Sequence, residues 1–432
     1  MQVLVYCSKH FCAEKMHAVT LILLLTLVPL VYSNKYENIP DYALKLEERI
    51  EKHGYPVEIH QIITEDGYIL GAYRIPHGVK KEEPENRNKS AVLIVHGMGG
   101  APHNFLVLGK ERAAPYYFAD RGIDVWLFAA RASETPFKKH IELDWDKDPE
   151  FWAHSFHEIG IYDVAATIDY ILNCTGQEKV TLIGHSAGGT EFYVLLADRP
   201  EYNQKVKVTI GWGAAPILHR MDYPVMLLGI YLDDFIKFLF SLFARHEVLP
   251  GFIADTKSSM IDYYLQRHPL WYNVLKFSLA GIGSHNSILA RYDEYNPIII
   301  SNIPRMSGRQ LLHFLDNVKT GTFKKYDYGP KGNLKRYGQK EPPHYNISAI
   351  TAPAAFFNSG LDGEISLADV CESIRRLPNP MFLHRIPFHR FTHTDYIFGY
   401  NATELVYEPT LQLIRKIDNG VVFPRVKVPS DY

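Results

Sequence analysis

The stretch of sequence that decides the fold is K-V-T-L-I-G-H-S-A-G-G-T-E-F-Y-V-L-L-A-D at 179–198. Residues 179–183 form an apolar run typical of a buried strand, and residues 190–198 suit a helix. Between them, G-H-S-A-G at 184–188 matches a pattern in which a serine lies on a sharp strand-to-helix turn and glycines leave room for the crossing strand and helix. A bare G-x-S-x-G is frequent by chance, but this context predicts that Ser186 is a nucleophile.

A serine hydroxyl is a weak nucleophile at neutral pH, so it needs a base, and the base needs an acid to orient it. For a serine in this kind of turn, the acid and then the base follow along the chain. Asp362 lies in the loop directly after a predicted strand at 354–358, which is where the acid is expected. Asp369 is the alternative, but it falls within a predicted helix at 366–377, where we expect it to be solvated. We therefore predict Asp362 as the acid.

The base is expected in the loop after the last predicted strand, at 382–386. His389 and His393 follow this strand, and His384 lies within it. His393 is the furthest from the strand and the best placed to reach over the sheet edge. We therefore predict His393 as the base.

Acyl transfer also needs N–H donors aimed at the oxyanion that forms in the transition state. One donor is expected from the residue after the nucleophile, Ala187, and the other from the glycine-rich turn H-G-M-G-G at 96–100, which follows a buried strand at 91–95. The predicted donors are the backbone N–H groups of Met98 and Ala187.

Strands alternate with helices through most of the chain, which predicts an α/β fold with a mainly parallel central sheet covered by helices on both faces. The turn at Asp66-Gly67 joins two alternating segments into a hairpin. The predicted elements are hairpin strands at 57–64 and 68–75, a strand at 123–128, a helix at 161–172 and a closing helix at 409–417.

The sequence pattern changes between 205 and 346. Apolar and aromatic segments such as 224–243 and 260–279 are not divided into strand lengths by turn residues. We expect a helical cap over 205–346, inserted between two parts of the α/β core at 34–204 and 347–432. Segment 224–243 carries two aspartates and a lysine, so it is a better amphipathic helix than a membrane span. Buried packing inside the cap is the simpler interpretation of its apolar face, and a lipid-contacting surface is the alternative.

The N-terminus has the organisation of a secretory signal peptide. Lys9 and Lys15 precede an apolar run at 18–32, and small residues follow near Ser33. This run is about 15 residues long, shorter than the ~20 that a bilayer requires. We expect cleavage of 1–33 and no transmembrane segment in the mature chain, with Met16 as an alternative start.

Glycosylation motifs fit the same secretory route, which leads to secretion or to the lysosome. The sequons begin at Asn88, Asn173, Asn346 and Asn401. The chain has 46 Lys and Arg against 48 Asp and Glu and contains no basic run, which argues against nucleic acid as a partner. The predicted chemistry uses no cofactor and no metal.

Several longer stretches carry a resemblance to a known family. They are E-D-G-Y-I-L at 65–70, V-H-G at 95–97, D-V-W-L at 124–127, F-W at 151–152, S-F-H-E at 155–158, I-Y-D at 161–163, I-D-Y-I at 168–171, T-G-Q-E-K at 175–179, R-P-E-Y at 199–202 and the region from His393 to L-V-Y at 405–407. With these stretches the chain resembles the acid lipases, which include gastric and lysosomal acid lipases and many insect relatives.

The resemblance implies an α/β-hydrolase fold and a secreted or lysosomal ester hydrolase for neutral lipids such as triacylglycerols or sterol esters. It also implies that Ser186, Asp362 and His393 form a catalytic triad, that Met98 and Ala187 hold the oxyanion, and that the cap contains a mobile lid. The expected partner is therefore a lipid ester at a lipid–water interface.

The sequence departs from the family in three places. Ala187 stands where the family usually has glutamine, and F-A-A-R-A-S-E at 128–134 stands where the family commonly has a loop that contains glycine, asparagine, serine and arginine. The cap cysteines of gastric-type members are missing, since no cysteine lies between 174 and 371. These changes leave the backbone donor in place and bear on substrate range and lid stiffness.

Two other functions remain open at this stage. One is an esterase for smaller or more polar esters, which the apolar insertion disfavours. The other is a catalytically silent lipid-binding protein on the same fold. A silent relative would be expected to lose its nucleophile or base, whereas Ser186, Asp362 and His393 are all present.

Overall fold

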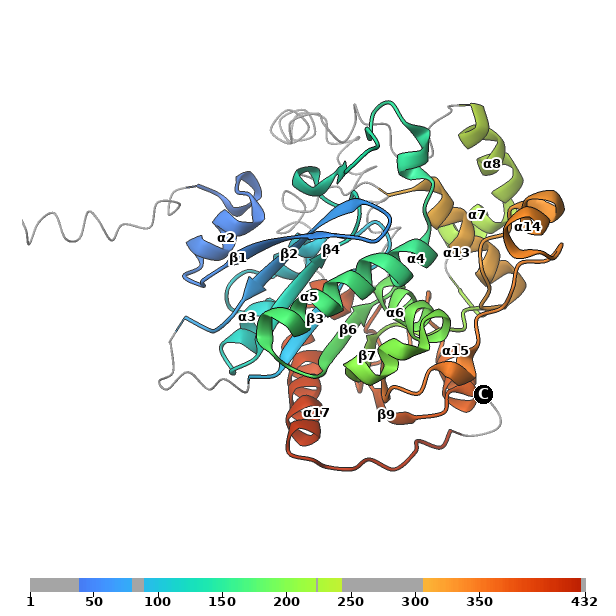
Figure 1. The fold of residues 1–432 in the computed structure, drawn as a ribbon. Coiled ribbons are helices and arrows are strands. Elements are labelled where there is room, and N and C mark those ends of the chain that lie inside the picture. Colours follow the sequence, from blue (N-terminus) through green and yellow to red (C-terminus); the bar gives the residue numbers. More distant parts are fainter. Residues whose placement is uncertain (1–38, 80–88, 223, 243–305, 429–432) are drawn as a thin grey trace, which may run out of the picture.

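The computed structural model describes residues 39–79, 89–222, 224–242 and 306–428. The expected signal peptide at 1–33, Asn88 and the apolar segment at 260–279 lie outside these residues. The described chain is built around one nine-stranded sheet (Figure 1). The strands are β1 (Glu58–Ile63), β2 (Tyr68–Ile75), β3 (Ala91–Val95), β4 (Asp124–Ala129), β5 (Lys139–His140), β6 (Val180–His185), β7 (Val206–Trp212), β8 (Ala354–Asn358) and β9 (Pro380–Arg385).

The sheet has the order β1-β2-β4-β3-β6-β7-β8-β9, with β5 paired to β2. From β4 to β9 all neighbouring strands are parallel, whereas β2 is antiparallel to β1, β4 and β5. The expected hairpin is confirmed, since Glu58 pairs with Arg74 and Ile63 with Ile69. Because the carboxyl ends of parallel strands meet at one edge, the loops after β3, β6, β8 and β9 lie close together.

Helices cover both faces of the sheet, as expected from the sequence. The longer helices are α2 (Leu46–Lys52), α3 (Ala114–Ala119), α5 (Ala165–Thr175), α6 (Ala187–Asp198), α7 (Pro224–Tyr231), α8 (Asp233–Leu242), α13 (Gly308–Thr320), α14 (Gly329–Tyr337), α15 (Leu367–Arg376) and α17 (Glu408–Asp418). Two short helices, α4 (Phe156–Glu158) and α16 (Asp395–Phe398), complete the set used below.

Alternate residues of each buried strand enter two separate cores, as the period of a strand requires. On β3, Leu93 and Val95 pack with residues of α5, α6, α13 and α15, whereas Val92 and Ile94 pack with residues of α2, α3, α16 and α17. Each face of the sheet therefore has its own apolar core.

The boundary at 205 that was expected for the start of the helical insertion is too early. Residues Val206–Trp212 form β7, which lies between β6 and β8 in the sheet. The sequence does not reveal this strand, because Lys207 and Thr209 interrupt its apolar run and no turn signal separates it from the next segment. The described helices of the insertion are α7, α8, α13 and α14, all of which lie between β7 and β8 in the chain.

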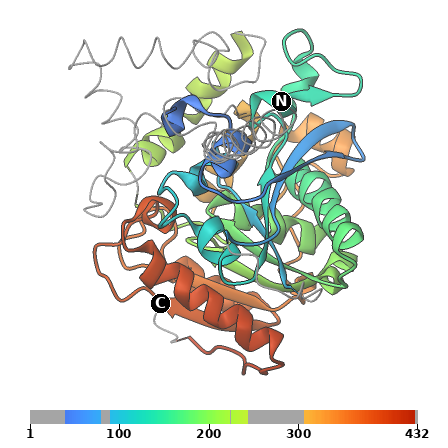
Figure 2. The same cartoon turned by 90° about the vertical axis from the view of Figure 1, so that its left-hand side faces the viewer.

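The segment expected to be one amphipathic helix at 224–243 forms two helices, α7 and α8, which break at Leu232. The simpler interpretation was burial inside a cap, but several of the apolar side chains that the structure describes in this segment are exposed. Leu228, Tyr231, Phe235 and Phe238 are 56%, 85%, 55% and 55% exposed. Both views place α7 and α8 at the end of the molecule opposite α17 (Figures 1 and 2). None of the helices in the described ranges is both long and apolar enough to cross a bilayer.

Candidate active site

Ser186 lies on the tight turn between β6, which ends at His185, and α6, which begins at Ala187. Its φ of 54° and ψ of −127° are strained for a residue with a side chain. The Ser186 N–H donates to the carbonyl of Trp212 at the end of β7, 3.2 Å away. A Cβ on Gly188 would lie only 2.5 Å from the carbonyl oxygen of Val95, so the glycine lets α6 cross the end of β3. The local sequence therefore produces the turn that its G-x-S-x-G pattern predicts.

Asp362 and His393 are in direct contact. Nδ1 of His393 donates to Oδ1 of Asp362 over 2.9 Å, and both side chains are almost completely buried. The same Oδ1 accepts the backbone N–H groups of Glu364 and Ile365 at 3.1 and 2.9 Å. These donors fix the carboxylate in place, so it holds a proton of His393 on Nδ1.

The contact between Asp362 and His393 lies beside the serine turn. The ring of His185, the residue before Ser186, is hydrogen-bonded through Nε2 to the carbonyl of His393 over 2.9 Å. Gly213 follows the Trp212 carbonyl that binds Ser186. A Cβ on Gly213 would lie 2.7 Å from Oδ2 of Asp362 and 3.2 Å from Nδ1 of His393. The structure thus brings the three residues together from the ends of β6, β8 and β9.

Glu364 is a fourth residue of this cluster and was not singled out from the sequence. Its Oε2 lies 3.3 Å from Nε2 of His393, close enough for an ion pair. Among the residues that the structure describes, Nε2 has no aligned hydrogen-bond partner. Burial lowers the pKa of His393, but the negative charges of Asp362 and Glu364 more than offset this and raise it to about 9. The only signal in the sequence is a carboxylate two residues after the predicted acid.

The two expected oxyanion donors flank Ser186. Ala187 is the first residue of α6, where a backbone N–H has no partner within the helix. A Cβ on Gly97 would lie 2.9 Å from the Cβ of Ser186, so the turn that carries Met98 packs against the serine. The sulfur of Met306, which precedes α13, lies 3.4 Å from the position of a Cβ on Gly99. The insertion therefore reaches the same turn.

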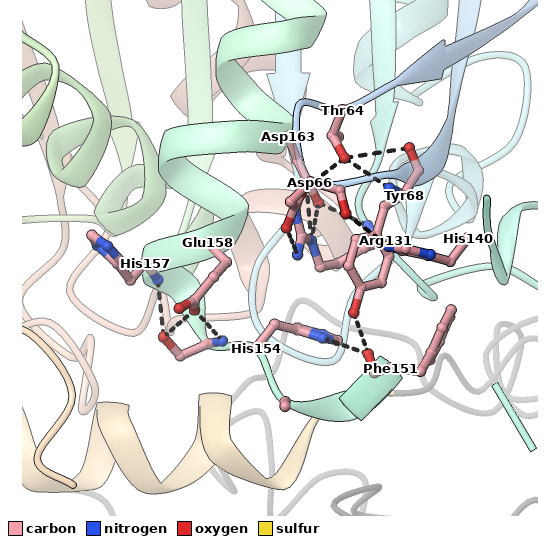
Figure 3. Close-up of polar contacts among 12 residues, drawn as sticks. Thr64, Asp66, Tyr68, Arg131, His140, Phe151, His154, His157, Glu158 and Asp163 are labelled. Atoms are coloured by element: carbon pink, nitrogen blue, oxygen red, sulfur yellow. Dashed lines mark hydrogen bonds and ion pairs between the residues drawn. The ribbon is translucent and has the colours of Figure 1, made fainter. Parts of the chain in front are cut away.

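The loop after β4, where the sequence departs from the family, is held by an arginine. Nε of Arg131 donates to Asp163 over 2.9 Å, and its Nη1 donates to Asp66 over 2.8 Å (Figure 3). The preceding N–H, of Ala130, donates to Nε2 of His96 at the start of the glycine-rich turn 96–100, 3.4 Å away. This buried network therefore fixes the loop against the turn.

His96 can act as the acceptor of the Ala130 N–H. Burial lowers its pKa to about 4, so its ring is neutral at physiological pH and can accept at Nε2. Its Nδ1–H can then donate to the carbonyl of Gly97 over 2.9 Å. The neutral ring links the β4 loop to the turn that carries Met98.

The alternative residues for the acid and the base make other contacts. Asp369 is fully buried rather than solvated, and its carboxylate accepts the backbone N–H groups of His219 and Arg220 at 2.9 and 2.8 Å. The expectation was wrong because these partners are 149 and 150 residues away in sequence. His384 bonds the carbonyl of Leu405, and His389 is exposed. Within the described ranges, no cluster of His, Cys, Asp and Glu has the makings of a metal site.

Comparison with known proteins shows the family to which the chain belongs. A family model described as a partial alpha/beta-hydrolase lipase region matches residues 46–109, and one described as the alpha/beta hydrolase fold matches residues 90–264. Lipase member K of Mus musculus is 31% identical over 88% of this chain and 94% of its own length. Lipase 3 of Drosophila melanogaster is 31% identical over 86% and 93%. Gastric triacylglycerol lipase of Bos taurus is 32% identical over 89% and 94%. With this identity over nearly the whole of each relative, the chain belongs to the gastric and acid lipase family of α/β-hydrolases and is a carboxylic ester hydrolase.

Proposed function

We propose that the protein is a lipase that cleaves esters of neutral lipids, such as triacylglycerols or sterol esters, through an acyl-enzyme on Ser186. The observation that carries the proposal is the buried contact of Asp362 with His393 beside the strained turn of Ser186. A serine, followed along the chain by a carboxylate and then by an imidazole, supplies the parts that nucleophilic acyl transfer requires on this fold.

The chemistry follows from the two nitrogens of His393. Asp362 holds the proton on Nδ1, so Nε2 takes the proton of Ser186 as Oγ bonds the acyl carbon. The backbone N–H groups of Met98 and Ala187 stabilise the oxyanion. His393 then gives its Nε2 proton to the departing alcohol, and a water molecule repeats the sequence to release the acid.

The apolar insertion supports a lipid substrate. Helices α7 and α8 expose Leu228, Tyr231, Phe235 and Phe238, a surface that is unfavourable in water and favourable at an oil interface. In the proposed domain organisation, the described helices α7, α8, α13 and α14 belong to a cap with a mobile lid, between core parts that end with β7 and resume near 347. Triacylglycerol is named as the substrate of gastric lipase relatives.

The same proposal includes a secretory destination, outside the cell or in the lysosome, after removal of 1–33. Glycosylation at Asn88, Asn173, Asn346 and Asn401 belongs to this route. Three of these asparagines, Asn173, Asn346 and Asn401, are exposed, which supports their use as acceptors. Treatment of the secreted protein with an amidase that removes N-glycans should lower its mass.

The decisive experiment measures hydrolysis of emulsified triacylglycerol, sterol ester and a soluble short-chain nitrophenyl ester across acid and neutral pH. A lipase hydrolyses the emulsified lipids, and its rate rises once substrate exceeds its solubility. Turnover of the soluble ester alone would replace the lipase proposal with an esterase for small esters. No turnover of any ester by folded protein would refute both.

A further inference from the structure

The insertion touches two of the proposed catalytic loops. Just before α7, the N–H of Asp222 donates to the carbonyl of Gly363, in the loop of the predicted acid, over 2.7 Å. Just before α13, the sulfur of Met306 lies 3.4 Å from the position of a Cβ on Gly99, in the turn that carries Met98. The first contact joins two backbones and does not depend on a side chain. The second depends on the side chain of Met306, so it can be tested by substitution.

The glycine-rich turn at 96–100 has little packing of its own. Three of its five residues are glycines, which restrict the backbone least, and residues 97–100 are only half-buried. The N–H of Gly100 donates to the carbonyl of Gly97 over 2.9 Å, and Gly99 has a φ of 62°. We therefore expect the conformation of the turn to depend on the neighbours that pack against it.

Two parts of the core and one part of the insertion hold this turn. Gly97 packs against the turn of the nucleophile, and the ring of His96 accepts the N–H of Ala130 over 3.4 Å. The third neighbour is Met306, whose sulfur lies on the side of the turn where Gly99 has no side chain. Apart from the chain neighbours of Gly99, no other heavy atom of the described residues comes within 4 Å of the Cβ position. The insertion therefore supplies the contact on this side of the turn.

Helix α13 fixes the backbone beside Met306, because the first turn of the helix is tied to the core. Ser307, the next residue, is buried and caps the helix with its hydroxyl, which also donates to the carbonyl of Trp152 over 2.6 Å. One turn further on, Nε2 of Gln310 donates to Oε1 of Glu191 on α6 over 3.3 Å. The side chain of Met306 therefore reaches the glycine-rich turn from a fixed point.

We propose that Met306 is a positioning residue that holds the turn at 96–100, and with it the N–H of Met98, in the place that the oxyanion requires. The inference rests on the proposed function, in which this N–H stabilises the transition state. An oxyanion donor is effective only when it is held in position before the charge develops. A loosened turn therefore lowers turnover without weakening the binding of substrate. In this way the insertion supports the chemistry as well as the contact with lipid.

The first test measures kinetics on a soluble short-chain ester, which needs no lipid interface. Met306→Ala removes the contact, so kcat should fall about tenfold or more while KM stays within about twofold of the parental value. Met306→Leu keeps the volume and should restore kcat to within about threefold. The control Leu315→Ala, on the buried face of the same helix, should lower the melting temperature and keep kcat. Parental kcat in Met306→Ala, or an equal loss of kcat in folded Leu315→Ala, overturns the proposal.

Hydrogen exchange of the turn separates this inference from the proposed function. Mass spectrometry follows the exchange of a peptide that covers 96–105 in the parent, Met306→Ala and Leu315→Ala. Loss of the Met306 side chain should speed exchange of the turn by about fivefold or more, and the control should keep the parental rate. An unchanged rate in Met306→Ala overturns the inference, whether or not the parent hydrolyses esters. If Met306→Ala does not fold, Met306→Val, which shortens the same side chain, takes its place in both tests with the same criteria.

Discussion

Ser186, Asp362 and His393 are 9%, 6% and 3% exposed, whereas Tyr231 and Phe235 on α7 and α8 are 85% and 55% exposed. Each region inverts the usual rule, since polar groups are buried in the first and large apolar groups face solvent in the second. Polar groups stay buried where hydrogen bonds fix them, and apolar groups stay exposed where another apolar phase is to be met. The comparison therefore supports the proposed chemistry at the strand ends and the proposed interfacial contact of α7 and α8.

Helix α13 shows that the insertion itself is divided. Its His313 is buried and bonds the hydroxyl of Ser155 over 3.0 Å and the carbonyl of Lys324 over 2.8 Å. Leu315 is 2% exposed and packs at Gly229 of α7. Helix α13 therefore belongs with the buried region, and α7 rests on it with an apolar surface toward solvent.

The largest effect should come from the buried region. Ser186→Ala removes the only acyl acceptor of the proposed mechanism, so activity on every ester should fall by on the order of 10⁶-fold, to background. The melting temperature should stay near the parental value or rise, since the strained turn keeps its backbone contacts. Near-parental turnover by the folded variant would remove Ser186 from the mechanism.

The next effect distinguishes two buried aspartates. Asp362→Asn should lower the kcat of the folded protein by on the order of 10⁴-fold, because Nδ1 of His393 loses its acceptor. Both substitutions should destabilise the fold by about 1–3 kcal/mol, since each carboxylate binds two backbone N–H groups. The folded fraction of Asp369→Asn should keep parental kcat. Denaturant unfolding and kinetics on both variants check the pair, and reversed results would mean that the acid is misassigned.

A smaller effect should come from the exposed helices. Leu228→Asp or Phe235→Asp removes the contact of one large apolar side chain with lipid, worth about 1.5–3 kcal/mol. Activity on emulsified triacylglycerol should therefore fall about tenfold or more, with no change on a soluble short-chain ester. Leu315→Ala, on the buried face of α13, is the matched contrast and should lower the melting temperature. Equal losses on both substrates with a lowered melting temperature in Phe235→Asp would make α7 and α8 part of the scaffold.

The smallest effect is the pH dependence of the melting temperature, which tests whether α13 belongs to the buried region. Burial lowers the pKa of His313 to about 3, so the folded state keeps this ring neutral while the unfolded chain takes up a proton below about 6.5. Its contribution to stability is full above that value and declines as pH falls toward 3. The melting temperature should therefore drop by several degrees from about pH 7.5 to about pH 5. His313→Asn should flatten this dependence relative to His389→Asn at an exposed site, and parallel curves would count against it.

Much of the fold could be predicted because its signals are local. The run before Ser186, the glycines of its turn and the Asp66-Gly67 hairpin each specify their conformation within a few residues. The start of the insertion was misplaced because β7 becomes a strand through its neighbours β6 and β8 rather than through its own pattern.

The side-chain neighbourhoods were harder to predict because they join distant segments. His393 and Asp362 could be proposed from chain order, since the strand ends converge at one edge of a parallel sheet. Glu364 could not, because its approach to Nε2 depends on the conformation of the loop after β8. Asp369 looked solvated for a similar reason, since only the folded chain brings His219 and Arg220 to it.

Gly213 gives the site an unusual profile of mutational tolerance. It has a φ of 53° and would bring any Cβ to 2.7 Å from Asp362 and 3.2 Å from His393. In a saturation library scored for activity, substitutions at this position would look as damaging as those at Ser186, although glycine contributes no reactive group. In a library scored for expression, the two positions would separate, because the strained backbone at Gly213 also affects folding. Loss of activity in a screen therefore identifies residues that shape this site as well as residues that react in it.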